Sequence, residues 1–213
     1  MELNLISNEF HNNSAINGGA IYFMEKETTQ NDLYNRTIYL ENNSFKNNSA
    51  MDFGGALFYK MSNTYISTVI NNEISFNKAE IMGGGVYSAN TNYQSFNIKN
   101  LSVYNNTINS FINNYSSKPS YLVLNNKLNS NTINIIPGES FSLNFTLYDA
   151  FNNPFIDFTK YYSSITLRVL LQDYYYNSDD NNLFSNVNLT GNFGSFRNGK
   201  KNVNNIIFIL LIK

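Results

Sequence analysis

Apolar and polar residues alternate in short stretches along this chain, which is the pattern of strands that bury one face. In the first half such stretches lie at residues 3–5, 38–40 and 101–103. In the second half residues 141–147 alternate without interruption, and residues 165–171 repeat the pattern. The sequence therefore predicts an all-β protein.

One phrase occurs three times in the first half. Each copy reads Asn-x-(Phe or Ile)-x-x-Asn-x-Ala, followed by two glycines and a second apolar stretch. The shared residues are Asn8, Phe10, Asn13, Ala15, Gly18 and Gly19, then Asn43, Phe45, Asn48, Ala50, Gly54 and Gly55, then Asn72, Ile74, Asn77, Ala79, Gly83 and Gly84. The copies start 35 and 29 residues apart. Repeats of this length indicate a stacked architecture.

A fourth, degenerate copy follows. Leu101 and Val103 alternate, and we align Asn106 and Ile108 with the first asparagine and the apolar residue of the phrase. Phe111 then stands in place of the second asparagine, and the two glycines are missing. Terminal repeats are often atypical because they cap the stack, so we expect the stack to end near residue 125.

Two or three short strands in each unit fit a right-handed parallel β-helix, in which equivalent residues lie about 4.8 Å apart. The first asparagines would then form a hydrogen-bonded ladder. Phe10, Phe45 and Ile74 would form an apolar stack, and the alanines a corner of small residues. The unequal spacing falls in outward loops, of which residues 24–36 are the longest and most charged.

The phrase carries a family resemblance. Phe10-x-x-Asn13 and Phe45-x-x-Asn48, each followed by Gly-Gly-Ala, resemble the repeat of chlamydial polymorphic outer membrane proteins. The same repeat occurs in large pectin-lyase-fold surface proteins of protists, including ciliates. The resemblance covers about residues 1–125; Ile74 and Gly85 depart from it. It implies a β-helix at a cell surface with an adhesion or coat role, and it does not imply an enzyme.

The pattern changes after about residue 135, where Pro137-Gly138 predicts a turn. Alternating strands with turns between them favour a partial immunoglobulin-like β-sandwich. We therefore expect β-helix repeats over 1–125, a linker over 126–135 and a partial Ig-like domain over 136–200. Residues 201–213 read as an apolar tail with no turn before it, consistent with an error in the gene model. Both ends look cut, so we expect the chain to be a fragment.

The amino-acid composition argues against several classes of function and site. The net charge is −1 and 14% of residues are charged, so the chain lacks the basic surface that nucleic acid requires. There is no cysteine, which excludes disulfides and thiolate metal sites. No segment reaches the ~20 apolar residues of a membrane-spanning helix. Membrane attachment would therefore come only through parts outside this chain.

Candidate chemistry is sparse, and we predict no catalytic, cofactor-binding or metal-binding residue. Catalysis needs convergent titratable groups, and glycoside hydrolysis needs two facing carboxylates; neither pattern occurs. His11 is the sole histidine and reads as solvated. Gly83-Gly84-Gly85 has no following Lys-Ser, so it reads as a repeat corner. Asp179 and Asp180 lack the further ligands of a calcium site.

Nine Asn-x-Ser/Thr sequons are candidate glycosylation sites: Asn12, Asn35, Asn42, Asn47, Asn100, Asn105, Asn114, Asn144 and Asn188. About a fifth of all residues are asparagine, so about seven such sequons are expected by chance under the same motif rule. The sequons permit glycosylation and argue for it only weakly.

The sequence favours a non-enzymatic, extracellular or cell-surface protein that displays loops for structure or adhesion, with a surface protein or glycan as partner. One alternative is a fragment of a β-helix carbohydrate-active enzyme, a lyase or hydrolase, whose catalytic coils lie outside this chain. A second alternative is a gene-model fragment with no function of its own.

Overall fold

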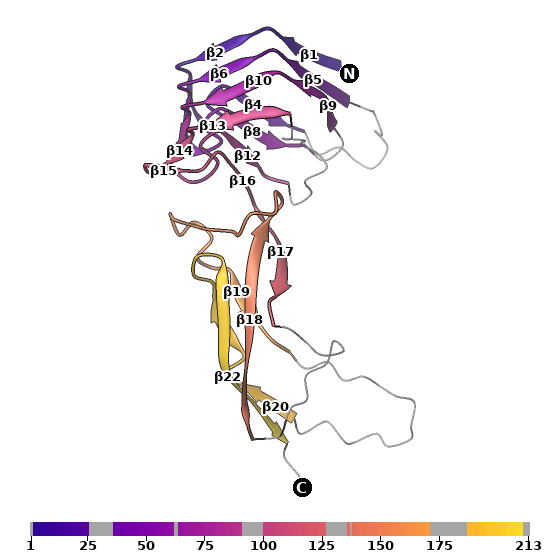
Figure 1. Ribbon diagram of the computed structural model, residues 1–213, viewed down its shortest axis with the longest axis vertical. Helices are drawn as coiled ribbons and strands as arrows, with labels where there is room; N and C mark the ends of the chain where they lie inside the picture. The colour runs from indigo at the N-terminus through magenta and orange to yellow at the C-terminus, as the bar shows by residue number, and fades with distance from the viewer. Residues whose placement is uncertain are drawn as a thin grey trace. The chain divides into compact units, whose positions relative to one another are not determined.

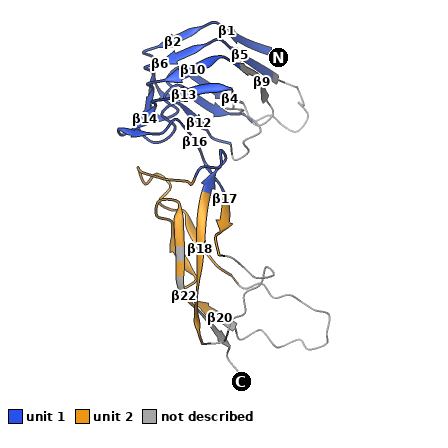
Figure 2. Cartoon of the chain, viewed as in Figure 1, with its two compact units in different colours: residues 1–121, 148–153 blue, residues 122–147, 154–213 orange. Residues whose placement is uncertain are grey.

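The computed structural model describes residues 2–25, 36–61, 64–90, 100–126, 136, 138–170 and 187–210. These residues form strands and no helix, which confirms the predicted all-β class. They divide into two compact units (Figure 2). Unit 1 contains residues 1–121 and 148–153, and unit 2 contains residues 122–147 and 154–213.

Unit 1 consists of four sheets whose strands pair mainly in parallel (Figure 1). Sheet A holds β1 (Glu2–Ile6), β5 (Arg36–Glu41) and β9 (Thr64–Ile70). Sheet B holds β2 (Glu9–His11), β6 (Ser44–Lys46), β10 (Asn72–Ser75) and β13 (Leu101–Tyr104). Sheet C holds β3 (Ser14–Asn17), β7 (Ser49–Phe53), β11 (Lys78–Ala79), β14 (Thr107–Ile108) and β15 (Phe111–Ile112). Sheet D holds β4 (Ile21–Met24), β8 (Leu57–Lys60), β12 (Val86–Ser88) and β16 (Tyr115–Ser117).

Each pass of the chain through these sheets is called a rung here. Rungs 1, 2 and 3 contain β1–β4, β5–β8 and β9–β12, and rung 4 contains β13–β16. A full rung thus has four strands, where the sequence predicted two or three. The extra strand exists because the asparagine phrase is itself divided: its first part lies in sheet B and its second part in sheet C.

The pairing registers bring equivalent residues into contact from one rung to the next. Phe10 is opposite Phe45, which is opposite Ile74. The rings of Phe10 and Phe45 are parallel within 2°, with centroids 4.7 Å apart. Ala50 is likewise paired with both Ala15 and Ala79. Phe45 and Ile74 are fully buried in the main core of unit 1, with Phe10 packed against it. Ala50 and Ala79 form a second, smaller cluster with Ile108.

The structure corrects our alignment of the fourth copy by five residues. Val103, rather than Ile108, lies opposite Ile74, and Ile108 lies opposite Ala79. Asn106 follows Asn77 after 29 residues and is its equivalent. The error arose because Asn-x-Ile matches the first asparagine position of the phrase, whereas in the fold Ile108 takes the position of the alanine. The constant spacing of 29 residues between the later rungs would have distinguished the two alignments.

The first asparagines form one hydrogen-bonded ladder. The backbone N–H and side-chain Nδ2 of Asn8 both donate to Oδ1 of Asn43, each at 3.0 Å. Asn43 donates in the same way to Oδ1 of Asn72, at 3.0 and 2.8 Å. The Nδ2 of Asn43 also donates to the Leu5 carbonyl oxygen in the preceding rung, at 2.8 Å. The Asn43 amide thus bonds both of its neighbouring rungs, and the Asn72 amide bonds the Leu40 and Ile70 carbonyl oxygens. Asn43 and Asn72 are therefore buried with hydrogen-bond partners.

The second asparagines form a longer ladder, which Asn114 caps. It runs from Asn13 through Asn48 and Asn77 to Asn106, with the same paired donation at 2.8–3.0 Å. Asn106 then donates its backbone N–H and its Nδ2 to Oδ1 of Asn114, at 3.1 and 3.2 Å. Asn114 is only eight residues away in sequence, so the chain turns back on itself and caps the ladder.

The two glycines of the phrase have different physical roles. The first has a positive φ in every copy, 61° at Gly18, 67° at Gly54 and 68° at Gly83, a conformation that glycine adopts without steric cost. The second allows close approach of backbones. A Cβ atom on Gly55 would lie 2.6 Å from the Lys78 carbonyl oxygen and closer still to that of Gly84.

Rung 4 has no such glycines because its path is different. Asn109 and Ser110, with φ of 45° and 71°, connect β14 to β15 in a tight antiparallel hairpin. The returning chain places the Asn114 carbonyl oxygen beneath rung 3, where it would lie 2.6 Å from a Cβ on Gly85. This contact explains why the third copy has Gly85 where the first two have alanine.

Unit 2 contains a four-stranded and a two-stranded sheet. The first has the order β17 (Pro119–Leu124), β18 (Ser140–Asp149), β22 (Lys200–Leu210) and β20 (Val187–Thr190). The second pairs β19 (Thr166–Arg168) with β21 (Phe193–Ser195) in antiparallel register. Leu143, Val203 and Ile206 form the buried centre of the larger sheet.

The structure corrects our expectation of an apolar tail after residue 200. Residues 200–210 form β22, which pairs with both β18 and β20. A turn precedes it: Arg197 and Lys200 exchange backbone hydrogen bonds of 2.9 and 3.0 Å. Asn198 and Gly199 have φ of 50° and 70°, as in the two-residue Asn-Gly hairpin loops that match strand twist. The Asn198-Gly199 dipeptide is the sequence signal for this hairpin, and our sequence analysis did not use it.

The other predicted boundaries compare as follows. The two units meet in sequence at residues 121 and 122, near the predicted end of the repeats at 125. Residues 148–153, at the end of β18, belong to unit 1, which no sequence pattern indicated. There the Ala150 N–H donates to Oγ of Ser117, and the Phe151 ring meets that of Tyr115 edge-on. The predicted linker over 126–135 lies, apart from Asn126, outside the described residues.

Substituting a ladder asparagine should destabilise unit 1 far more than substituting its neighbour. Asn48→Ala removes the acceptor of both Asn13 donors, and it removes the Nδ2 donor to the Phe10 carbonyl oxygen and to Asn77. We expect the free energy of unfolding, measured by urea titration and circular dichroism, to fall by about 2–4 kcal/mol. Asn47→Gly is the control, because Asn47 is exposed and glycine tolerates its φ of 56°. Equal losses in both variants would contradict the ladder as the source of stability.

Gly55→Ala should be among the most damaging single-methyl additions. The added Cβ meets rigid backbone oxygens in rung 3, so we expect a loss above about 3 kcal/mol or failure to fold. The matched control is Gly194→Ala, where the added Cβ meets only the flexible side chain of Lys201. Thermal melts of the two variants test this, and a normal melt for Gly55→Ala would show that the rungs are not packed at van der Waals distance.

Candidate functional site

The residue that precedes a ladder asparagine forms an exposed corner in every rung. Asn12, Asn42, Asn47 and Asn105 occupy such corners, with φ between 54° and 56°. Each is also the asparagine of a predicted sequon, because a ladder asparagine and then a serine or threonine follow it. Asparagine is favoured in left-handed corners. Backbone geometry therefore accounts for these four sequons without reference to glycosylation.

The remaining sequons have diverse positions. Asn100 and Asn144 are exposed. Asn114 is partly buried, and its side-chain oxygen caps the second ladder. Asn35 and the side chain of Asn188 lie outside the described residues, as do Asp179, Asp180 and most of the charged loop over 24–36.

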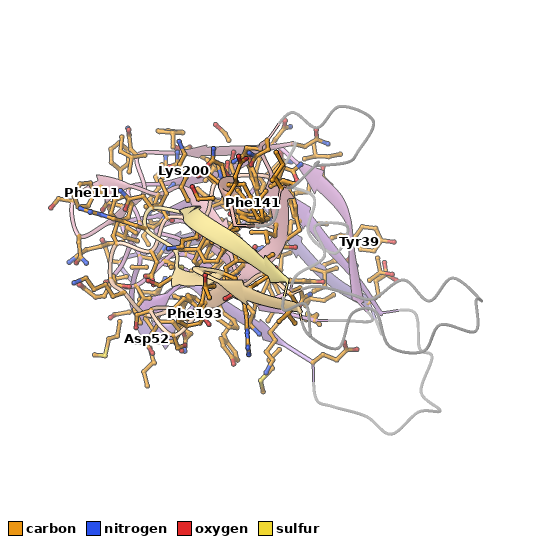
Figure 3. The ribbon with its side chains drawn as sticks, turned by 90° about the horizontal axis from the view of Figure 1, so that it is seen from below. Tyr39, Asp52, Phe111, Phe141, Phe193 and Lys200 are labelled. Carbon is orange, nitrogen blue, oxygen red and sulfur yellow. The ribbon has the colours of Figure 1, made fainter. Side chains whose placement is uncertain are left out.

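The outer face of sheet C exposes apolar side chains. Ile16 and Met51 follow the paired residues Ala15 and Ala50, and they are 62% and 65% exposed. Ile112, opposite Thr107 at the other edge of this sheet, is 69% exposed. Figure 3 shows Phe111, the residue next to Ile112, at the margin of the view and pointing away from the strands. Exposed apolar groups gathered on one surface mark interaction sites.

A row of aromatic rings on the outer face of sheet D is structural instead. Tyr22 stacks on Phe58 with centroids 4.8 Å apart, and Phe58 meets Tyr87 at 5.6 Å. Phe58 and Tyr87 are buried. A Cβ on Gly18 or Gly83 would touch Phe58 or Tyr87, respectively, so the rings cover the glycine corners.

Charged groups on sheet B are paired along and across the rungs. The Lys46 ammonium lies 2.9 Å from the Glu73 carboxylate, which also accepts a short hydrogen bond from the Tyr104 hydroxyl. The Tyr104 hydrogen bond and then that of Lys46 lower the pKa of Glu73 below its ordinary value. His11 lies 3.6 Å from Glu9 in the same strand. These contacts neutralise the surface and join adjacent rungs.

Asp149 is a buried acid of unit 1. Its carboxylate accepts the backbone N–H groups of Phe151 and Asn153, both at 2.9 Å. Burial raises the pKa of this carboxyl, and those hydrogen bonds oppose the increase. The bonds close the turn over residues 149–153, so Asp149 has a structural role.

The described residues contain no group of three or more His, Cys, Asp or Glu placed to hold a metal ion. The Gly83-Gly84-Gly85 run forms a corner between β11 and β12 and is packed against rung 4. In the same part of the chain, no helix has the length and apolar character needed to cross a membrane.

Unit 2 has a pocket of about 370 Å³ that sequence reasoning missed. It lies between residues 155–165 and the hairpin loop over 195–199. Lys160 and Arg197 are among its lining residues. The Asn198-Gly199 dipeptide predicts the hairpin loop that forms one side of the pocket. That this loop packs against residues 155–165 is seen only in the tertiary structure.

Comparison of the chain with protein-family models, curated proteins and solved structures finds no match.

The contribution of Glu73 to the stability of unit 1 should be lost as the pH falls below about 4.5, the ordinary pKa of a glutamate carboxyl. Because the folded-state pKa of Glu73 is lowered, its contribution is present above the unfolded-state value and is lost as the pH falls through the folded-state value. We expect the stability difference between wild type and Glu73→Gln, from urea titrations at pH 7 to 3, to shrink on acidification.

Tyr104→Phe is the companion variant, because it removes the largest cause of the lowered pKa. It should reduce the pH dependence without abolishing it, since Lys46 remains. A difference between wild type and Glu73→Gln that is constant over the whole pH range would contradict this assignment.

Proposed function

We propose that this chain is a non-enzymatic cell-surface or extracellular protein that displays a contact surface on a right-handed parallel β-helix. The observation that carries the proposal is the outer face of sheet C, where Ile16 and Met51 are exposed on the neighbouring strands β3 and β7, and Ile112 is exposed on β15 at the opposite edge. Solvated single apolar residues are ordinary, but three on one sheet face form a contact surface for a protein or glycan partner.

The hydrogen bonds inside unit 1 support the proposal that contact with a partner occurs on its outer face. In both asparagine ladders the side-chain donors and acceptors form hydrogen bonds with neighbouring rungs. The polar groups inside the stack therefore stabilise the fold. We infer that contact with other molecules involves the outer face and the loops. We further propose that unit 2 is Ig-like, on the basis of its four-stranded and two-stranded β-sheets.

The resemblance of the Phe-x-x-Asn and Gly-Gly-Ala phrase to polymorphic outer membrane protein repeats adds to the proposal. In that reading the exposed asparagines at the corners, Asn12, Asn42, Asn47 and Asn105, are open to glycosylation. Attachment to a membrane is through parts outside this chain, and nucleic acid is not a partner.

The contact surface is tested by adhesion. Beads coated with the purified chain should bind cells of its source organism, and the double variant Ile16→Ser/Met51→Ser should reduce bound beads at least about fivefold, as expected when apolar contacts are lost. Because both residues are exposed, the variant should melt like the wild type. Met24→Ser is the matched control, since Met24 is 55% exposed on sheet D.

Two outcomes would overturn the proposal. Unchanged adhesion of the double variant would remove sheet C as the contact surface. Release of reducing sugars from a polysaccharide panel by the purified chain would favour the carbohydrate-active enzyme instead. Antibody labelling of intact, unpermeabilised cells tests the location, and a signal seen only after permeabilisation would contradict surface exposure.

A further inference from the structure

The pocket of unit 2 is held open by backbone contacts on two sides. Leu147 donates its N–H to the Gly199 carbonyl oxygen at 2.7 Å, and its own carbonyl accepts the Phe155 N–H at 2.8 Å. Gly199 is buried with φ of 70°, and a Cβ there would lie 2.5 Å from the Phe155 carbonyl oxygen. The hairpin loop is thus fixed against residue 155, which makes the pocket a feature of the fold.

Two cations line this pocket without an anionic partner. Among the described residues, no carboxylate forms an ion pair with Lys160 or Arg197. The one acid of the lining, Asp157, is turned toward its own loop. Its carboxylate accepts the N–H groups of Tyr161 and Tyr162 at 3.1 and 2.6 Å, and the Thr159 hydroxyl at 3.1 Å. The pocket therefore presents positive charge to a ligand.

The remaining lining includes aromatic and hydroxyl-bearing side chains. Phe155 meets Tyr162 edge-on with ring centroids 5.4 Å apart, and Phe158 is 44% exposed. Ser163 and Ser195 add two hydroxyl groups. An aromatic face packs against the C–H face of a sugar ring, hydroxyl groups bond its hydroxyls, and a guanidinium binds a carboxylate in bidentate fashion. The volume lies in the range of small-molecule sites.

We propose that this pocket binds a carboxylate-bearing sugar ring, such as a uronic acid residue of an acidic glycan. Arg197 and Lys160 bind the carboxylate, Phe158 packs against the ring, and the serine hydroxyls bond its hydroxyl groups. A bare phosphate would satisfy the cations but leave the aromatic wall without a contact, which favours the sugar acid. The site goes beyond the proposed function, because it lies in unit 2 and does not involve sheet C.

The test is a titration of the full chain with D-glucuronate, followed by isothermal calorimetry and by amide chemical shifts. We expect a dissociation constant on the order of 1 mM, as for a ligand of this size, and at least tenfold weaker binding of D-glucose. Arg197→Gln and Lys160→Asn should each weaken binding at least about fivefold, since each removes a charge-assisted contact. Asparagine suits Lys160 because the φ there is 60°.

The matched control is Arg168→Gln, which removes the same charge from β19 outside the pocket lining and should leave the affinity unchanged. Three results would overturn the proposal: no saturable binding of glucuronate, equal binding of glucose, or inorganic phosphate binding as tightly as glucuronate. Retained affinity in a folded variant that combines Arg197→Gln with Lys160→Asn would also overturn it. None of these results bears on adhesion through sheet C.

Discussion

The structure of unit 1 depends on one hydrogen-bonding arrangement, in which an asparagine oxygen accepts two donors from the preceding rung. The backbone N–H and Nδ2 of Asn48 both reach Oδ1 of Asn77, and Asn13 reaches Asn48 in the same way. Because one side chain satisfies backbone and amide together, the chain can turn a corner inside the stack without burying an unpaired polar group. Neighbouring rungs are thereby held in one register.

The other repeated residues follow from that register. Once asparagines coincide, Phe10 must lie on Phe45 and Ala15 on Ala50. The residue before each ladder asparagine lies in a left-handed corner, which asparagine tolerates better than most residues other than glycine. This explains the pairs Asn12-Asn13, Asn42-Asn43 and Asn47-Asn48, and also the sequons that follow from them. Ser7 and Phe76, with φ of 55° and 58°, occupy such corners without being asparagine.

The repeat also leaves the surface free to vary. The ladders and the apolar stack fix the inward positions, whereas the outward positions of sheet C hold serine, lysine, isoleucine and methionine in different rungs. The proposed contact surface and the proposed sugar site both use residues outside the repeated phrase. A repeated residue packs against or bonds its equivalents in the adjacent rungs. Residues that contact a partner are therefore expected at positions that this packing does not constrain.

The sequence by itself determined the all-β class, the three good copies of the phrase and the positions of its core residues, because these depend on local spacing and side-chain type. It did not by itself indicate the register of the fourth copy, since Asn106-x-Ile108 matches the first asparagine position of the phrase, whereas in the fold Ile108 pairs with Ala79. Only the tertiary structure decided that Asn114 caps the second ladder, that residues 148–153 join unit 1 and that β22 completes a sheet. Each of these is a contact between segments distant in sequence or a reversal of the chain. The same holds for the pocket beside Arg197, whose lining residues come together only when the hairpin loop folds against residue 155.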